Sequence, residues 1–327
     1  MALDILFLGG TGIISTSSVR LAVERGHRVT VLNRGRTSSR PIPDAVEQLT
    51  GDVSDAASVD AALQGREFDV VAQFRAFLPD TVRTDVARFT GRTGQYVFVS
   101  SASAYQKPPA SIPVTEATPL KNPFWQYSRD KIACEDVLVA ADRDDDFPMT
   151  IVRPSHTYDD SLLPTMGGWT DIARMRAGKP VVVHGDGTTP WTLTHADDFA
   201  VGFVGLLGRP AALGSAYTIT GESAPTWNQV YTWLGHAAGV EQPHLVHVAS
   251  ERIAREVPDL GPGLVGDKAY AMLFDTTRLR RLVPEFATTI PYAEGARRQL
   301  AWYDAHPDAQ VVDAELDAHF DRLAELG

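Results

Sequence analysis

The stretch LDILFLGGTGIISTSSVRLAVERGHRVTVLN, residues 3–33, carries the pattern that decides the fold. Ile5–Leu8 is an apolar run of the length of a buried strand, and a glycine-rich segment follows it directly. Apolar positions within residues 19–23 predict a helix that Gly26 ends, and residues 27–32 predict a second buried strand. A strand, a glycine turn, a helix and a second strand in this order predict a right-handed βαβ unit with parallel strands.

The glycines of this stretch are suited to hold a diphosphate. Gly9 and Gly12 let the backbone turn sharply and approach a ligand, and the helix beyond them begins with unpaired N–H groups and positive dipole charge. The spacing is Gly-x-x-Gly-x-x-Ser, so Ser15 stands where a third glycine would be expected, and the closest packing there is relaxed or rearranged. A tight turn in any α/β protein is the alternative interpretation, and dinucleotide binding is favoured over it.

The end of the second predicted strand indicates which dinucleotide is preferred. In this architecture an acidic residue there pairs with the ribose 2′-hydroxyl, and a basic residue tolerates a 2′-phosphate. The position holds Asn33, followed by Arg34, Arg36 and Arg40, so NADP(H) is favoured over NAD(H). A solvated basic loop is the alternative. Asp52, after a third predicted strand, either reaches the adenine edge or caps the helix expected to begin near residue 54.

Strands alternate with helices along the first two thirds of the chain, which predicts an α/β fold with a doubly wound, mostly parallel Rossmann-type sheet. Further strands are predicted at residues 46–50, 69–73, 95–99, 149–152, 181–183 and 216–220. Helices are predicted at residues 79–89, 124–141, 170–177, 195–207, 226–238, 276–282, 293–305 and 311–325, with an exposed turn at 144–146. We expect a dinucleotide-binding domain formed by 1–160 and 191–221, and a smaller, mainly helical substrate-binding lobe formed by 161–190 and 222–327.

Composition limits the possible partners. The chain has 327 residues with 30 basic and 41 acidic side chains, a net charge of −11, so a nucleic-acid-binding surface is not expected. Cys134 is the single cysteine, so no internal disulfide forms, which fits a reducing cytoplasm. No apolar run approaches the length of a membrane span, and no signal peptide is recognisable. A cytoplasmic protein without a membrane partner is therefore expected.

A tyrosine and a lysine form the second informative motif. Tyr127 and Lys131 are four residues apart on a predicted helix, which puts them one turn apart on the same face. A neighbouring ammonium group is expected to lower the pKa of the phenol and make Tyr127 a general acid or base. Ser101 follows the fifth predicted strand, where its hydroxyl can bind a substrate oxygen. A chance helical pair and a serine-rich turn are the alternatives for these residues.

Together these segments resemble the extended or atypical short-chain dehydrogenases/reductases, the NAD(P)-dependent epimerase/dehydratase family. The similar segments are GGTGIIS, NRGR, GDV, VFVSSASAY, YSRDK, RPSHTY and HGDGTTPWTLTHADDFA, in family order from Gly9 to Ala200. The resemblance implies that Ser101, Tyr127 and Lys131 are catalytic, with hydride moving between the nicotinamide and the carbon that bears the reacting oxygen. It also implies that the cofactor is lined by Gly9, Thr11, Gly12, Ile13, Asn33, Arg34, Asp52, Val53, Phe74, Ala76 and Lys131.

Departures from the family pattern concern the substrate. Trp191 stands where sugar-nucleotide members usually carry a diphosphate-binding arginine, and His156 stands where they often have asparagine. These changes weaken a nucleotide-diphosphate sugar as substrate. Ala102 and Ser103 replace the acidic pair of the 4,6-dehydratase branch, so dehydration by that route is not expected. The candidate substrate residues are Ser103, His156 and Trp191.

The resulting prediction is an NAD(P)-dependent reductase, dehydrogenase or epimerase that acts on a hydroxyl or keto carbon of a sugar-like or other small polar molecule. The alternative is a non-catalytic dinucleotide sensor or RNA-associated protein on the same fold, although such relatives typically lose the tyrosine or the lysine. No metal is expected, because His156, His184 and His195 lack close ligand spacing. The resemblance also implies a homodimer that packs through the helices near 79–90 and 123–141.

Overall fold

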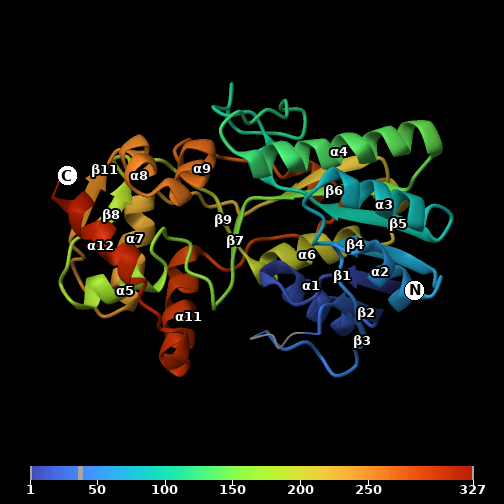
Figure 1. Cartoon of the computed structure of the whole chain (residues 1–327), viewed down its shortest axis with the longest axis horizontal. Coiled ribbons are helices and arrows are strands. Elements are labelled where there is room, and N and C mark those ends of the chain that lie inside the picture. Colours follow the sequence, from blue (N-terminus) through green and yellow to red (C-terminus); the bar gives the residue numbers. More distant parts are fainter. Residues whose placement is uncertain (1, 36–39, 326–327) are drawn as a thin grey trace.

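A parallel sheet of seven strands is the centre of the larger half of the molecule in this computed structural model, which describes residues 2–35 and 40–325 (Figure 1). Its strand order is β10 (Ser215–Ile219), β6 (Met149–Pro154), β5 (Thr93–Val99), β4 (Phe68–Gln73), β1 (Asp4–Leu8), β2 (Arg28–Asn33) and β3 (Glu47–Thr50). The chain starts in the middle at β1, runs outward to β3, and then crosses to the other side of β1 through β4. This order confirms the predicted doubly wound α/β fold.

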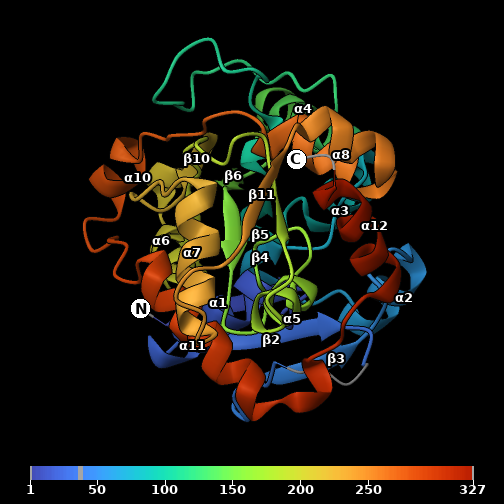
Figure 2. The ribbon, with the colours of Figure 1, turned by 90° about the vertical axis from the view of Figure 1, so that its left-hand side faces the viewer.

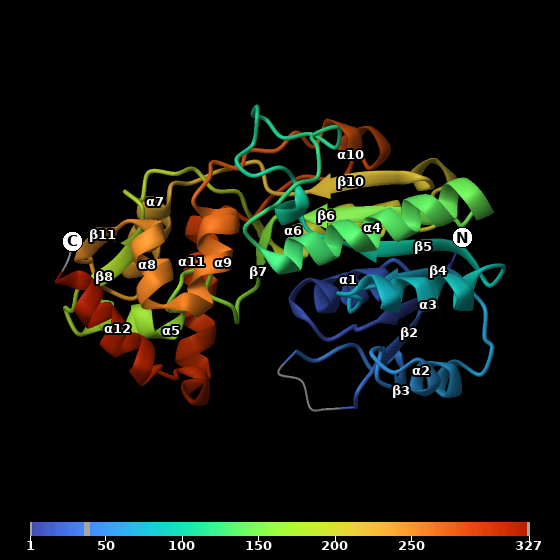
Figure 3. The ribbon, with the colours of Figure 1, turned by 45° about the horizontal axis from the view of Figure 1, so that its top comes forward.

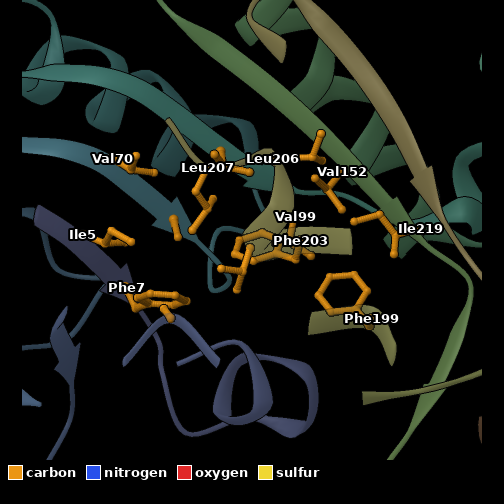
Figure 4. Close-up of a cluster of buried hydrophobic side chains, with 14 of the residues drawn as sticks. Ile5, Phe7, Val70, Val99, Val152, Phe199, Phe203, Leu206, Leu207 and Ile219 are labelled. Carbon is orange, nitrogen blue, oxygen red and sulfur yellow. The ribbon is translucent and has the colours of Figure 1, made fainter. Parts of the chain in front are cut away.

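Helices cover both faces of the sheet because successive strand residues point to opposite sides. Ile5 and Phe7 of β1 pack toward α1 (Ile13–Glu24) and α6 (Ala196–Leu206) in one buried apolar cluster, part of which Figure 4 shows. Leu6 and Leu8 pack on the other side, where the cluster includes residues of the remaining sheet helices. Those helices are α2 (Ala56–Leu63), α3 (Pro79–Phe89) and α4 (Gln126–Asp145), and Figure 3 shows α3 beside α4.

A second lobe is built from two short parallel strand pairs and several helices. The pairs are β8 (Val181–His184) with β11 (Leu245–Val248), and β7 (His156–Tyr158) with β9 (Leu193–His195). The helices are α5 (Trp169–Arg176), α7 (Trp227–Ala237), α8 (Ser250–Glu256), α9 (Gly261–Gly263), the π-helical turn η4 (Leu264–Lys268), α11 (Tyr292–Ala305) and α12 (Ala314–Ala324). Figure 2 views the molecule from the side of this lobe, with α7 and α12 on either side of β11.

One helix departs from the expected division into two units. α10 (Thr277–Leu282) was expected in the second lobe, but its Leu279 belongs to the same buried cluster as Phe7 and Phe203 on the sheet. The chain therefore returns to the sheet after leaving it, which the helical pattern of 276–282 by itself does not reveal. We propose the predicted division with this helix moved to the dinucleotide-binding unit.

Several element boundaries differ from the sequence-based expectation for identifiable reasons. The carboxylate of Asp55 accepts the backbone N–H groups of Ala57 and Ser58, so Asp55 caps α2 and the predicted Asp52 does not. The expected turn at 144–146 is largely helical, because α4 continues to Asp145 and ends at Asp146 in a left-handed conformation. β7, β9 and β11 were not predicted, since strands of three or four residues carry little periodicity.

Two further properties concern the described residues as a whole. None of their helices combines the length and the apolar character needed to cross a membrane. Within the same residues, no three His, Cys, Asp or Glu side chains are grouped so that they could hold a metal ion. Cys134 is a free and buried thiol.

Candidate active site

A cleft of about 910 Å³ runs along the carboxyl ends of the sheet strands. Twelve of the residues singled out in the sequence line it: Gly9, Thr11, Gly12, Ile13, Asn33, Arg34, Asp52, Val53, Phe74, Ser101, Tyr127 and Lys131. They come from segments after β1, β2, β3, β4 and β5 and from α4, so the parallel sheet brings them to one edge. The geometry thus unites the expected dinucleotide and Ser-Tyr-Lys residues in one cleft.

The glycine loop at the start of α1 is shaped for close approach. Gly9 has a φ of +91°, and a Cβ atom there would overlap the Arg75 side chain. The Oγ atom of Ser15 accepts the Gly12 N–H at 2.8 Å, so the serine forms a cap at the position where a third glycine was considered. Thr16 is the first residue whose N–H closes a helical bond, to Gly12, so the first turn of α1 presents donors toward the cleft.

The end of β2 carries the groups expected near the adenosine ribose. The Asn33 Oδ1 atom accepts the Gly35 N–H at 2.8 Å, which fixes the turn that presents Arg34 to the cleft. The pKa of Asp52 is lowered, mainly by hydrogen bonds from Ser54 and further by the charges of Arg34 and Arg75. Arg36 lies outside the described residues.

Arg40 has a different role from the one expected of the basic loop. It lines the cleft, but its guanidinium forms an ion pair with Asp159 and donates to the Ser161 hydroxyl at 2.6 Å. Both partners follow β7 on the other side of the cleft. Arg40 therefore joins the two walls of the cleft, and its charge is already paired with a carboxylate.

The segment after β4 supplies lining residues beyond those expected there from the family resemblance. Phe74 lines the cleft and packs on Phe203, with 5.0 Å between ring centroids. Arg75 and Phe77 also line the cleft. Ala76, expected to line the cofactor, is instead fully buried behind the cleft, and its carbonyl accepts a hydrogen bond from Lys131.

Lys131 is held inside the protein by backbone carbonyls. Its Nζ atom donates to the Ala76 and Val99 carbonyls at 2.8 Å each and lies 5.9 Å from the centre of the Tyr127 ring. Burial lowers the pKa of Lys131 to about 8. The lysine is thus positioned one helical turn from the tyrosine, as the spacing predicted.

The pKa of Tyr127 is not lowered as expected. Burial raises it above the usual value, and a side-chain hydrogen bond with Ser101 opposes that rise. The prediction that the Lys131 ammonium lowers this pKa is therefore wrong. The ammonium donates its hydrogen bonds to the two backbone carbonyls and not to the phenol. The phenol is protonated at neutral pH and is ready to act as a proton donor.

Two hydrogen bonds to Ser103 fix the position of the Ser101 hydroxyl. Its Oγ atom accepts the Ser103 N–H at 3.1 Å and shares a 2.9 Å hydrogen bond with the Ser103 hydroxyl at the short helix η1 (Ala102–Ala104). Ser103 is buried, also bonds to Ser128, and does not line the cleft. The structure therefore places Ser103 where it orients Ser101, whereas the sequence suggested substrate contact.

His156 and Trp191, the other candidate substrate residues, also lie outside the lining of the cleft. Ser155 and Thr157 line it, so the alternation of β7 directs His156 to the opposite side. Trp191 is 2% exposed and stacks on Trp227, with 6.0 Å between ring centroids. Sequence reasoning did not identify Ser155, Thr157 and Leu162 as lining residues: the first two lie in the segment RPSHTY, in which only His156 was considered, and no motif contains Leu162.

Two buried histidines make a pH-dependent contribution to stability. Burial, with a smaller effect of the Lys268 charge, lowers the pKa values of His156 and His184 to about 3. The unfolded chain binds these protons at an ordinary pKa of about 6.5, so the free energy of unfolding should fall as pH decreases from 6.5 toward 3. We expect His184→Leu to remove up to about 1.4 kcal/mol per pH unit of this dependence in urea titrations.

The control for this experiment is His236→Leu, which changes an exposed histidine. It should leave the wild-type pH dependence in place. Equal slopes for wild type and His184→Leu between pH 6.5 and 3 would contradict the assignment.

A buried ion pair supports the floor of the cleft. The Glu135 carboxylate accepts the Ser100 hydroxyl at 2.5 Å and pairs with the Arg153 guanidinium, with Nη2 2.5 Å from Oε2. Arg153 also donates to the Tyr105 hydroxyl at 3.1 Å. Glu135 is one turn beyond Lys131 on α4. This network therefore joins α4 to the ends of β5 and β6.

Known proteins are similar to this chain over most of its length. The model of the NAD dependent epimerase/dehydratase family matches residues 5–90 and 81–220. The 2′-dehydrokanamycin reductase of Streptomyces kanamyceticus is 28% identical over 87% of this chain and 80% of its own. Chloroplast stem-loop binding protein of 41 kDa b of Arabidopsis thaliana is 27% identical over 74% of this chain and 65% of its own. The solved epimerase of Methanothermobacter thermautotrophicus shares the fold, with a TM-score of 0.76 over 94% of each chain and 15% identity.

Proposed function

Because the chain belongs to the NAD dependent epimerase/dehydratase family, we propose that it moves hydride at a hydroxyl or keto carbon of a sugar-like or other small polar substrate. Membership supports an NAD-dependent enzyme, and similarity to a reductase and to UDP-glucose 4-epimerases supports an oxidoreductase that modifies sugars. One observation carries the proposal: Ser101, Tyr127 and Lys131 line the same cleft as the glycine loop.

The chain's own residues fit a dinucleotide. A Cβ atom at Gly9 would overlap the Arg75 side chain and one at Gly12 would lie 3.2 Å from Ser15 Oγ, and the first turn of α1 offers backbone donors for a diphosphate. Thr11, Ile13, Asn33, Arg34, Asp52, Val53, Phe74 and Lys131 would line the rest of the molecule. When bound, the dinucleotide accepts or supplies the hydride.

The acid–base steps are assigned to the serine and the tyrosine. Ser101 would donate a hydrogen bond to the substrate oxygen and fix its position beside the Tyr127 hydroxyl. In the direction of reduction, Tyr127 gives its proton to that oxygen; in oxidation it takes the proton back. Lys131, which lines the cleft with its Nζ atom 5.9 Å from the centre of the Tyr127 ring, would hold the dinucleotide beside that phenol. Ser103 positions Ser101.

We propose NADP(H) as the preferred dinucleotide. The end of β2 carries no carboxylate, and Arg34 lines the cleft next to Asn33. We expect Arg34→Ala to weaken NADPH binding about 10–100-fold, the value of one charge-assisted contact to phosphate, with little change for NADH. Fluorescence titration of both cofactors measures this, with Arg92→Ala as a matched change of an exposed arginine that does not line the cleft. Tighter binding of NADH by the wild type would contradict the preference.

Mass spectrometry of the dinucleotide released from denatured, freshly purified protein tests the proposed function. A stoichiometric dinucleotide supports an enzyme that retains its cofactor, as an epimerase does, because hydride leaves and returns to the same substrate. An empty protein that binds added NADPH supports a reductase or dehydrogenase that exchanges its cofactor at every turnover. Absence of binding to either dinucleotide would overturn the function.

A second candidate function is a non-catalytic, RNA-associated role. The observation in its favour is the 27% identity to the chloroplast stem-loop binding protein. The net charge of −11 and the joint presence of Ser101, Tyr127 and Lys131 favour the enzyme. A biological role that persists in a Tyr127→Phe protein able to bind dinucleotide would favour the second candidate.

We also propose a homodimer and a cytoplasmic location. Val139 on α4 is 45% exposed, and Leu78 at the start of α3 is 55% exposed. These two helices are the ones through which the family resemblance implies dimer contact. Sedimentation as a monomer at micromolar concentration would overturn the dimer, and cell fractionation tests the location, which rests on the lone Cys134.

A further inference from the structure

Seven polar and aromatic side chains from segments far apart in the sequence form one cluster near the turn that carries Ser101; four of them are buried, and His156, Asp267 and Lys268 are partly buried. Its members are Lys107, His156, His184, Trp191, Trp227, Asp267 and Lys268. We call it the Lys268 cluster. None of these residues lines the cleft already described.

Direct contacts connect five of the members one to the next. The Lys107 Nζ atom lies 2.9 Å from Asp267 Oδ1 and 5.9 Å from the centre of the Trp191 ring. Trp191 stacks on Trp227, whose ring meets His184 edge to face at 4.8 Å. Lys268 lies close enough to His156 and His184 for its charge to act on both rings.

The cluster adjoins the reacting residues. Asn122 donates to the Gly266 carbonyl at 2.7 Å and to the Ser103 carbonyl at 2.9 Å, so it ties η4 to the turn that carries Ser101. The charge of Asp267 acts on the Tyr127 phenol. Lys268 follows Gly266 by two residues on η4, so the cluster lies next to the turn that carries Ser101.

Five nitrogen atoms of this cluster are buried without a hydrogen-bond partner among the described residues. They are Lys107 Nζ, which has only its ion pair with Asp267, and His156 Nε2, His184 Nε2, Trp191 Nε1 and Trp227 Nε1. Trp191, Trp227 and His184 are at most 2% exposed. Buried polar atoms in proteins are normally satisfied, and leaving several of them unpaired in one place costs stability. Their concentration here indicates a polar partner that is not part of the chain.

The available groups define the chemistry of that partner. Both indole nitrogens are donors only, and the Lys268 ammonium is a donor that no residue described in the structure accepts from. The Asp267 carboxylate is the one acid in the cluster, and Lys107 pairs with it. The charges of Lys107 and Lys268 both act with this single carboxylate, so the two lysines leave the cluster with one positive charge in excess. Such a set suits a ligand that accepts hydrogen bonds and carries negative charge.

We propose that the Lys268 cluster binds the oxyanion of a sugar-sized substrate, a carboxylate or a phosphate group, while the reacting carbon of that substrate lies at Tyr127. This assignment rests on the proposed function and names the substrate class of the same site. Lys268 pairs with the oxyanion, and the two indole N–H groups donate to its oxygens.

The test compares sugars that differ in charge. Glucuronate, glucose 6-phosphate and glucose are titrated into the full chain, and intrinsic tryptophan fluorescence follows binding because Trp191 and Trp227 belong to the cluster. We expect at least one of the two anionic sugars to bind at least about tenfold more tightly than glucose. Which one binds better distinguishes a carboxylate from a phosphate.

Three variants test whether the Lys268 cluster causes the preference for an anionic sugar over glucose. Lys268→Met keeps the length of the side chain and should remove the tenfold preference without changing the affinity for glucose. Trp191→Phe keeps an aromatic side chain, although a smaller one, and loses the indole donor, and should weaken binding of the anionic sugar several-fold. Lys121→Met changes an exposed lysine at the same side of the molecule and should behave as wild type.

Failure of this inference can be told apart from failure of the proposed function. Equal binding of all three sugars, no binding of any, or an unchanged preference in Lys268→Met would overturn the oxyanion site, and the cluster then holds water. NADPH affinity is measured on the same samples, and only its absence bears against the enzyme assignment. Normal NADPH affinity also shows that each variant is folded.

Discussion

Replacement of Tyr127 by phenylalanine is expected to lower kcat by about 10²–10⁴-fold, the contribution of a positioned general acid or base. The change removes the one hydroxyl on α4 that lines the cleft beside Ser101 and bonds to it. The ring remains, so its packing on Trp125 at 5.0 Å between centroids is preserved and the cofactor region is untouched. NADPH binding should therefore stay within about twofold of wild type.

A matched control for this variant is Tyr217→Phe. Tyr217 lies on β10 away from the cleft, and its hydroxyl bonds to the Ala211 carbonyl at 3.1 Å. Loss of that bond should cost only about 1 kcal/mol of stability and leave kcat unchanged. The measurement is steady-state turnover on any substrate that the wild type converts. Turnover by Tyr127→Phe at the wild-type rate would remove the tyrosine from the mechanism.

Replacement of Glu135 by alanine is expected to destabilise the protein by about 3–5 kcal/mol. The substitution leaves the Arg153 guanidinium buried, with only the Tyr105 hydroxyl and its ring as partners. It also removes the acceptor of the Ser100 hydroxyl. Urea denaturation gives the free energy of unfolding, and Asp136→Ala serves as the control because Asp136 is the exposed neighbour on the same helix. The control should change stability by no more than about 0.5 kcal/mol.

A double variant separates loss of the ion pair from loss of packing. Glu135→Leu with Arg153→Met removes both charges and keeps much of the buried volume, so it should be less destabilised than Glu135→Ala alone. If Glu135→Ala costs less than about 1 kcal/mol, or if the double variant is the least stable, the network is not the support we describe. Because the pair joins α4 to β5 and β6, weaker catalysis should accompany the loss of stability.

Much of the site follows from local sequence. The apolar run Ile5–Leu8 and the glycines after it predicted the strand, the turn and the start of α1 as observed. Helical spacing predicted that Tyr127 and Lys131 share one face of α4. Parallel strands carry their loops to one edge, so Ser101 and Asn33 could be placed in the same cleft as these motifs without any knowledge of side-chain contacts.

The remaining features depend on contacts between distant segments. Trp191 packs against Trp227, which is 36 residues later in the chain, and the alternation of β7 turns His156 away from the cleft. Arg40 pairs with Asp159, which is 119 residues later in the chain, so its charge could not be assigned from the basic loop alone.

By itself, the sequence determined the doubly wound sheet, the glycine loop and the spacing of the tyrosine and lysine, because each is encoded in neighbouring residues. Only the tertiary structure decided how these groups behave. Burial raises the pKa of Tyr127 and lowers that of Lys131, and two backbone carbonyls from separate strand ends hold the lysine. The tertiary structure also brings the members of the Lys268 cluster together. Proton affinity and ligand chemistry depend on which groups surround a side chain, and those neighbours come from the whole fold.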